Sequence, residues 1–151
     1  MKIQYPAKIT FDSNDGRFFV QLLDLEEAIT EGENLEEALF NASEVLTLTL
    51  ESRMDEGSDI PAPCSARQEK DIYFISPSAR IQAALLIKLA KGKHTTAELA
   101  RALSTSWPAV ARLEDPHHWP SLKQLERIAG VLGQRLVISL EPTNNKVGLV
   151  S

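Results

Sequence analysis

The sequence has few of the residues that stabilise secreted or metal-bound domains. Among its 151 residues there are one cysteine and three histidines, and 6% are aromatic. The lone Cys64 cannot form an internal disulfide, and with His117 and His118 adjacent in one loop no metal-ligand spacing is present, so we expect no metal site and no cofactor. No apolar run approaches a membrane span, and the first ten residues lack the apolar run of a signal peptide. We therefore expect a cytoplasmic protein that does not contact membranes.

Charge is divided unequally along the chain. Residues 1–70 hold six Lys and Arg against fifteen Asp and Glu, a net −9, whereas residues 71–151 hold ten against six, a net +4. A basic half suits the phosphate backbone of nucleic acid, and an acidic half repels nucleic acid and suits a basic protein. The alternative is that surface charge only keeps each half soluble.

The first 50 residues predict strands followed by a helix. Apolar and polar residues alternate over 2–11, as in a half-buried strand, and the turn DSNDG leads through Gly16 into a second strand, RFFVQLLDL. A third short strand is expected at 28–31. Asn34 and Glu37 then cap a long helix, and strands followed by a covering helix predict an α+β fold. The apolar stripe of this helix is Leu35, Ala38, Leu39, Ala42, Leu46 and Leu50.

The middle of the sequence predicts a domain boundary. Residues 55–70 are rich in proline and small polar residues without periodicity, which indicates a loop or linker. The segment DIYFI, 71–75, has strand composition and can return to the sheet as a fourth strand, so a first domain is expected at 1–75. Ser76 as N-cap and Pro77 in the first turn then open a second domain, expected at 76–142. Its first helix carries Ile81, Ala84, Leu85 and Leu89 and stops near Gly92.

Residues 95–133 have the spacing of a helix-turn-helix followed by a supporting helix. Thr95 and Glu98 form a capping box, and the short polar residues before Ser106 predict a tight turn with Ser106 as the next N-cap. Ser121 caps the third helix, which Gly133 is placed to end. The apolar positions at helical spacing are Leu99, Ala100, Leu103, Val110, Leu113, Leu122, Leu125, Ile128, Ala129 and Leu132.

This region resembles the phage-repressor-like (Cro/repressor, or XRE) class of helix-turn-helix domains. The pattern ELAxxLxxSxxxVxRxE is present over 98–114, and PSLxxLxxIAxxLG is intact over 120–133. Ser104 stands where the class usually has a turn glycine, which a short polar residue tolerates at some strain. Trp107 and Pro108 occupy two positions that often carry Gln and Ser for reading bases. Apolar contact with thymine methyl groups is the readout open to them.

The resemblance implies an all-helical DNA-binding domain whose second helix enters the major groove. Residues at or before the N-terminus of the first helix are expected to hold phosphates, and residues at the start of the second helix are expected to lie in the groove. Arg112 follows one turn later as either a base or a phosphate contact. The phosphate candidates are Lys91, Lys93, Thr95 and Thr96, and the groove candidates are Ser106, Trp107, Pro108, Ala109 and Arg112.

Several neighbouring residues have two interpretations. Trp107 either faces DNA or covers the helix-turn-helix core, and Arg101 is either a phosphate contact or part of a solvated face. His117 and His118 either approach the DNA backbone or are exposed loop residues. Trp119, beside a proline at a helix start, is expected to pack.

The C-terminal segment RLVISLEP, 135–142, predicts a strand with no obvious partner inside a helical domain. An unpaired strand edge is usually satisfied by another chain, so we expect it to pair with its copy in a homodimer. The alternative is that it folds back locally. Residues 143–151 are expected to form a flexible tail. The dimerisation residues are Leu136, Val137, Ile138, Ser139 and Leu140.

The N-terminal half resembles the HicB antitoxin family over roughly residues 3–50. The shared features are a tyrosine-proline strand, Gly-x-Phe-x-Val in the second strand, an Asp-Leu pair, Thr-x-Gly, and a helix beginning EEALxNA. One branch of this family carries a helix-turn-helix behind that domain, so the order of parts fits the whole chain. The matching residues are Tyr5, Pro6, Gly16, Phe18, Val20, Asp24, Leu25, Thr30, Gly32, Glu36, Glu37, Ala38, Asn41 and Ala42.

The HicB resemblance implies both partners. It implies a partial RNase H-like βββαβ domain that neutralises HicA, a small basic toxin that cleaves mRNA. It also implies that the antitoxin, as a homodimer or as a tetramer in the toxin complex, binds double-stranded operator DNA of its own operon. The charge division agrees with both roles. We expect toxin contacts on the acidic segment 24–33, at Asp24, Glu26, Glu27, Glu31 and Glu33.

No catalytic residues are expected, although an RNase H-like fold raises the question. A two-metal nuclease needs carboxylates that converge on one point. Those of the N-terminal half occupy a hairpin turn, a strand end and a helix start, where turn, surface or dipole effects account for them. Two other functions stay open: a free-standing dimeric transcriptional repressor with a ligand- or protein-sensing N-terminal domain, and a remnant module without a partner. The carboxylates weighed are Asp12, Asp15, Asp24, Glu26, Glu36 and Glu37.

Overall fold

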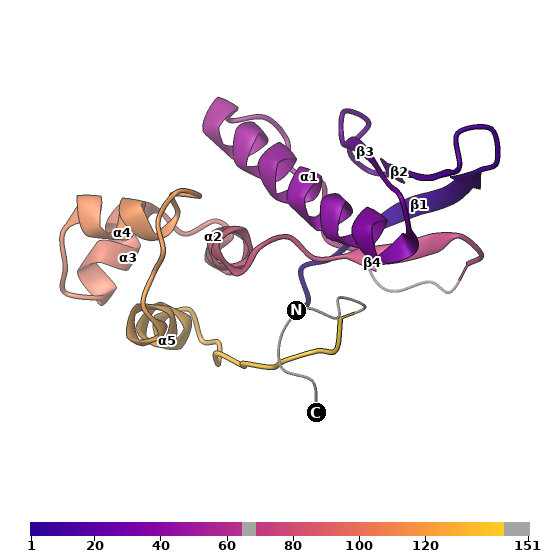
Figure 1. The fold of residues 1–151 in the computed structure, drawn as a ribbon. Coiled ribbons are helices and arrows are strands. Elements are labelled where there is room, and N and C mark those ends of the chain that lie inside the picture. Colours follow the sequence, from indigo (N-terminus) through magenta and orange to yellow (C-terminus); the bar gives the residue numbers. More distant parts are fainter. Residues whose placement is uncertain (65–68, 144–151) are drawn as a thin grey trace. The chain divides into compact units, whose positions relative to one another are not determined.

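The computed structural model describes residues 1–64 and 69–143, which fall into two compact units. Residues 2–64, 69–78 and 140–143 belong to an α+β unit, and residues 79–139 form a helical unit (Figure 1). Most of the predicted tail, residues 144–151, lies outside the described residues. Within the described ranges, no helix combines the length and the hydropathy needed to cross a membrane.

The α+β unit contains one four-stranded antiparallel sheet with the order β3-β2-β1-β4. Pairs such as Ile9 with Val20 and Tyr5 with Ile75 set the register of β1 against its two neighbours. Gly16 turns the first hairpin at a φ of +66°, as its position in DSNDG predicts. The return of residues 72–75 as a fourth strand is confirmed. The strands are β1 (Tyr5–Asp12), β2 (Arg17–Leu22), β3 (Ile29–Gly32) and β4 (Ile72–Ile75).

Helix α1 (Leu35–Glu56) crosses one face of this sheet (Figure 1). The Asn34 side chain accepts a hydrogen bond of 2.8 Å from the backbone N–H of Glu37, so the predicted N-cap is confirmed. Gly57 ends the helix in the left-handed conformation, which places the start of the linker at residue 57 rather than 55. Of the predicted apolar stripe, Ala38, Ala42, Leu46 and Leu50 are buried, whereas Leu35 and Leu39 are half-buried.

Strand β3 approaches α1 so closely that only glycine fits at residue 32. A Cβ atom on Gly32 would lie 2.4 Å from the backbone nitrogen of Ala38 and 2.8 Å from its Cα. The Asn41 side chain donates a hydrogen bond of 2.8 Å to the carbonyl of Glu31 in the same strand. The Thr-x-Gly motif in β3 and the EEALxNA motif in α1 therefore pack directly against each other.

The start of the linker is held against β1. The Tyr5 hydroxyl donates a hydrogen bond of 2.8 Å to the carbonyl of Pro61, and the N–H of Cys64 donates to the carbonyl of Gln4 at 3.1 Å. Burial raises the pKa of Tyr5 to about 12, and the negative charge of Asp24 adds to this effect. Tyr5 is fully buried, as the alternation predicts, but Phe11 at the hairpin end of β1 is exposed and contacts the Phe18 ring across the hairpin.

The helical unit begins three residues later than the sequence suggests. We predicted Ser76 as the N-cap with Pro77 in the first turn, but α2 begins at Ala79. The Ser43 hydroxyl donates to the carbonyl of Ser76 at 2.7 Å, and the N–H of Ser78 donates to the Thr47 hydroxyl at 2.9 Å. These bonds to α1 keep residues 76–78 out of the helix. The helices are α2 (Ala79–Lys91), α3 (Thr96–Ala102), α4 (Trp107–Leu113) and α5 (Leu122–Val131).

The helical unit has its own apolar core, which largely matches the predicted positions. Two predictions are wrong: Leu89 and Leu122 are exposed. At the end of α2, Ile87 packs in the core in place of Leu89. Leu122 is the first residue of α5 and precedes the turns of that helix that pack against the core. The core consists of Ile87, Leu99, Ala100, Leu103, Val110, Leu113 and Ile128, with Leu125 and Leu132 packed against it.

The predicted strand over residues 135–142 is not formed in the single chain. Residues 134–143 have no regular secondary structure. A strand requires a neighbouring backbone edge for its N–H and C=O groups, and none of the described strands pairs with this segment.

Candidate nucleic-acid and protein-binding sites

The turn between α3 and α4 is closely held by its caps. The Thr95 hydroxyl accepts from the N–H of Glu98 at 3.1 Å, and the Glu98 carboxylate accepts from the N–H of Thr95 at 3.0 Å, so the capping box is confirmed. Ser106 caps α4 by accepting from the N–H of Ala109 at 3.3 Å. Ser104 lies between the helices at a φ of +54°, the left-handed conformation expected for this turn. Two short helices are thus fixed at a tight turn.

The start of α4 forms an exposed surface. Trp107 is 57% exposed, so it does not cover the core and the second interpretation of this residue is wrong. Ser106, Pro108 and Arg112 are also exposed, whereas Ala109 is half-buried. The indole, the proline ring and a guanidinium one turn later are therefore available to a ligand of the helical unit.

Lys91, a predicted phosphate contact, is engaged inside the helical unit. Its ammonium group lies 2.9 Å from the Glu114 carboxylate and donates to the Thr96 hydroxyl at 3.0 Å. The Lys91 and Glu114 side chains are 17% and 23% exposed. This ion pair joins the end of α2 to the end of α4 and neutralises the Lys91 charge. We missed the pair because its partners are far apart in sequence, although Glu114 ends the repressor-like motif.

The N-terminus of α3 also carries its own negative charge. Hydrogen bonding from the Thr95 backbone, with His94 at 3.2 Å as a second cause, lowers the pKa of Glu98. The Thr95 N–H is therefore already donated to a carboxylate. Exposed cations nearby are Lys93 and Arg101, and both interpretations of Arg101 stay open.

The loop after α4 departs from one prediction. His117 is exposed and His118 is half-buried, and the two backbone N–H groups donate to the side chain and the carbonyl of Asp115 at 2.9 and 3.1 Å. Trp119 is exposed rather than packed.

Three of the five predicted toxin contacts are paired with arginines of the same unit. Two guanidinium nitrogens of Arg53 donate to the Glu27 carboxylate at 2.8 Å each, and this bond lowers the pKa of Glu27. Arg17 lies 3.2 Å from the Glu31 carboxylate and 3.7 Å from that of Glu33. The other two, Asp24 and Glu26, are exposed and form no ion pair within the described ranges.

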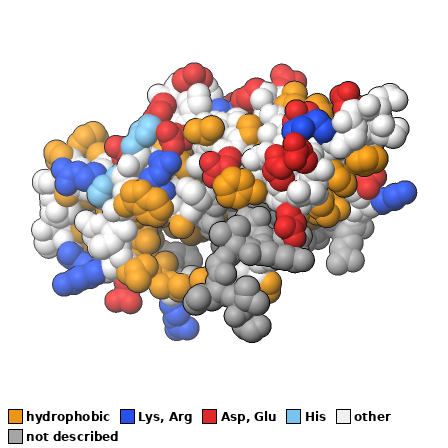
Figure 2. All heavy atoms as spheres, viewed as in Figure 1, with side chains coloured by type: hydrophobic (Ala, Val, Ile, Leu, Met, Phe, Trp, Pro, Cys, Tyr) orange, Lys and Arg blue, Asp and Glu red, His pale blue; other side chains and the backbone are white. Residues whose placement is uncertain are grey.

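A second acidic surface, which sequence reasoning missed, lies on the outward side of α1. Phe40 is 51% exposed and Leu48 is 64% exposed, and Glu44 lies between them at four-residue spacing. Figure 2 shows Asp and Glu side chains intermixed with hydrophobic ones where α1 crosses the sheet. The available signal was two large apolar residues outside the core-facing stripe.

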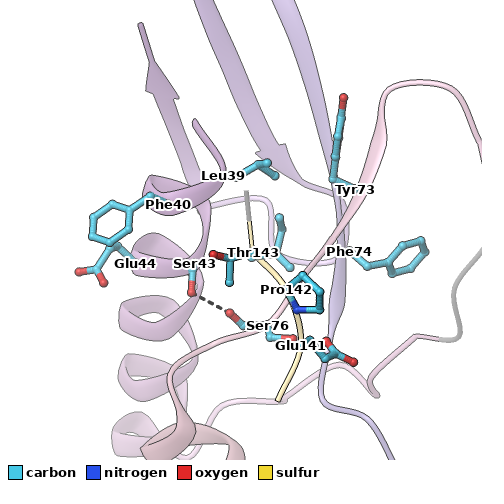
Figure 3. Close-up of a pocket in the computed structure, with 11 residues that line it drawn as sticks. Leu39, Phe40, Ser43, Glu44, Tyr73, Phe74, Ser76, Glu141, Pro142 and Thr143 are labelled. Atoms are coloured by element: carbon cyan, nitrogen blue, oxygen red, sulfur yellow. Dashed lines mark hydrogen bonds between the residues drawn. The ribbon is translucent and has the colours of Figure 1, made fainter. Parts of the chain in front are cut away.

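A groove adjoins this surface between α1 and β4, with a volume of about 390 Å³. Leu39 and Ser43 face β4 across it, and Glu44 stands at its outer side (Figure 3). Tyr73 and Phe74 line the opposite wall. Its lower end is lined by Glu141, whose carboxylate lies 2.6 Å from the Lys2 ammonium, and by Pro142.

The predicted dimerisation segment is largely uncovered. Val137, Ile138 and Leu140 are exposed, Ser139 is exposed, and Leu136 is half-buried. Three large apolar side chains within four residues are thus left uncovered by the residues that the structure describes.

Comparison with known proteins assigns the family. The family model of a HicB-like antitoxin of bacterial toxin-antitoxin systems matches residues 4–80. Antitoxin HicB of Pseudomonas fluorescens is 30% identical over 140 residues, covering 92% of this chain and 96% of that protein. Antitoxin HicB of Escherichia coli is 25% identical, covering 89% and 96%.

Among solved structures, the N-terminal domain of Burkholderia pseudomallei antitoxin HicB aligns with a TM-score of 0.42 and 18% identity, covering 50% of this chain and 99% of that one. The sequence matches extend over both units of the chain. From the family match and the Pseudomonas relative together, the chain belongs to the HicB antitoxin family.

Proposed function

We propose that this antitoxin neutralises a HicA-type toxin, a small basic mRNA-cleaving ribonuclease, and represses its own operon by binding operator DNA. The toxin-binding part is the α+β unit, which we take to be a partial RNase H-like domain. The DNA-binding part is the helical unit, with α3 and α4 as the helix-turn-helix. The observation that carries the proposal is the charge division of −9 over residues 1–70 and +4 over residues 71–151, which approximately follows the division into two compact units in a HicB family member.

For DNA, we propose that α4 enters the major groove with its exposed start. Trp107 and Pro108 offer apolar contact to thymine methyl groups, and Arg112 reads a guanine or binds a phosphate. Lys93 lies at the phosphates. Thr95 and Thr96 are less available than the sequence suggests, because Glu98 accepts the Thr95 N–H and the Thr96 hydroxyl accepts from Lys91. Lys91 supports α4 through Glu114.

The test is a mobility-shift titration on the promoter fragment of the operon. Arg112→Ala is expected to weaken binding by about 1 to 3 kcal/mol if the residue reads a guanine. Lys8→Ala is the matched control, because it removes one exposed positive charge from the other unit. Equal affinities of the two variants would remove Arg112 from the contact set, and a wild-type chain that ignores the promoter at low salt would refute DNA binding.

For the oligomer, we propose a homodimer in which residues 136–140 pair with the same residues of a second chain. The exposed Val137, Ile138 and Leu140 support this, since pairing would cover their side chains and supply backbone partners. Half-sites in the operator would then lie about 34 Å apart or at a multiple of that distance. Sedimentation of Ile138→Asp is expected to show monomers where the wild type shows dimers.

For the toxin, the test is co-expression with the open reading frame beside the gene. The product of that frame is expected to arrest growth alone and to be harmless and bound when this chain is present. Asp24 and Glu26, the two unpaired carboxylates of the segment 24–33, are the contacts we retain there. A neighbouring product that is harmless by itself would contradict the proposed function.

A further inference from the structure

We propose that the outward face of α1, with Phe40 and Leu48 as apolar anchors and Glu44 between them, is the principal surface on which the cationic toxin docks. This inference rests on the proposed function, and it names the surface that performs it. It also moves the main contact away from the segment 24–33, where the sequence alone placed it.

The first argument is exposure. Side chains four residues apart lie on one face of a helix, so Phe40, Glu44 and Leu48 form a continuous row. Phe40 and Leu48 are 51% and 64% exposed although the opposite face of α1 is fully buried against the sheet. Large apolar side chains that lie together on a surface, with charged residues around them, are typical of a protein-binding site.

The second argument is uncompensated charge. Helix α1 carries six carboxylates against one arginine, Arg53, and that arginine is held by Glu27 through two bonds of 2.8 Å. In the segment 24–33, by contrast, three of five carboxylates are paired with Arg17 or Arg53. Within the described ranges, Glu36, Glu37, Glu44 and Glu56 of α1 form no ion pair, so uncompensated negative charge lies along the helix that carries the apolar row. The carboxylates of α1 are Glu36, Glu37, Glu44, Glu51, Asp55 and Glu56.

The third argument is the shape beside the row. The groove of about 390 Å³ between α1 and β4 is lined by apolar side chains such as Leu39 and Pro142 together with polar ones, and Glu44 lies at its outer side (Figure 3). A long cationic side chain lays its methylene stem along apolar surface and keeps its charged end near a carboxylate. The groove thus fits a lysine or arginine of the partner.

Charge also decides between a toxin and a second copy of this chain. Two α1 faces brought together would place Glu44 and the neighbouring carboxylates Glu36 and Glu37 opposite the same carboxylates of a second copy, and like charges that meet across an interface are destabilising. A partner with excess positive charge is attracted to this face, whereas a second copy of the chain is repelled by it.

The experiment measures the affinity of the full-length antitoxin for the basic protein encoded beside this gene. The basic protein is co-expressed with the antitoxin, separated from it in denaturant and refolded. Binding is then measured by calorimetric titration. The double variant Phe40→Ala, Leu48→Ala is expected to weaken binding about 10- to 100-fold. The matched control is Phe19→Ala, Ile29→Ala, because these residues of β2 and β3 are similarly exposed, at 44% and 47%. The control is expected to bind within about threefold of the wild type.

A second pair of variants tests the charge argument. Glu44→Gln is expected to slow association severalfold at low salt and to leave it unchanged at high salt, because screening removes the attraction. Asp15→Asn, which removes one charge from the exposed hairpin turn, is the control and should slow association less.

The outcomes separate the two levels of the proposal. If the wild type and the double variant of Phe40 and Leu48 bind the partner equally well, the docking surface alone is overturned. Amide hydrogen exchange must show that α1 is intact in the variant. A larger loss in the Phe19 and Ile29 variant also overturns it and assigns the contact to the open face of the sheet. A wild type that does not bind at all overturns the proposed function and the docking surface together.

Discussion

Replacing Gly32 by alanine tests whether the contact between β3 and α1 is as rigid as its geometry indicates. The added Cβ would lie 2.4 Å from the backbone nitrogen of Ala38, 2.8 Å from its Cα and 2.9 Å from the carbonyl carbon of Glu37. All three neighbours are backbone atoms, so no side chain can turn aside and the strand or the helix must shift. Overpacking of this kind costs about 1 to 3 kcal/mol, and we expect about 3 kcal/mol here because the obstacle is main chain.

The assay is hydrogen-exchange mass spectrometry at increasing urea, which follows the two units separately. Amides of β2 and α1 in Gly32→Ala should exchange at lower urea, whereas those of α5 should not change. The matched control is Gly130→Ala in α5, where nothing lies within 4 Å of the new Cβ. That variant should be more stable by up to about 1 kcal/mol, since alanine favours helix. Unchanged protection of β2 and α1 in Gly32→Ala would refute the close-packing argument.

Further predictions concern single groups. Tyr5 has a folded pKa of about 12 against an ordinary 10, so its neutral form stabilises the fold below pH 10, and roughly 2 to 3 kcal/mol is lost as pH rises from 10 through 12. In urea titrations, Tyr5→Phe should therefore be about 1 kcal/mol less stable at pH 7 and should lack that alkaline loss; an identical loss would contradict it. Ser104→Gly should stabilise by about 0.5 to 1 kcal/mol in thermal melts, because glycine relieves the positive φ, whereas Ser104→Ala should not. Lys91→Met and Glu114→Gln should each destabilise by about 1 to 2 kcal/mol, and a double-mutant cycle that shows no coupling would refute the pair.

Local features of the fold were predictable from sequence because each depends on residues within a few positions. The capping box of Thr95 and Glu98, the caps at Asn34 and Ser106, and the left-handed turn at Ser104 all formed as expected. Strand alternation and the turn at Gly16 likewise predicted the hairpin, and the strand composition of residues 71–75 indicated that β4 could return to the sheet. The α2 start was wrong because side chains of α1, 33 and 31 residues away, bond the backbone of Ser76 and Ser78.

Candidate sites were less predictable, because a site depends on which groups remain uncovered after packing. Sequence alone could not decide whether Trp107 faced outward, and it wrongly predicted that Trp119 packs. It also counted Lys91 as a free cation, whereas Glu114 neutralises it across the helical unit.

The sequence by itself determined the division of this protein into an acidic α+β part and a basic helical part, together with its family, because composition, caps and short motifs are properties of neighbouring residues. Only the tertiary structure decided which charges and apolar side chains are left for a partner. Glu27 and Arg53 neutralise each other from 26 residues apart, and Phe40 and Leu48 stay exposed on a helix whose other face is buried. Both outcomes follow from distances in space that positions along the chain do not specify.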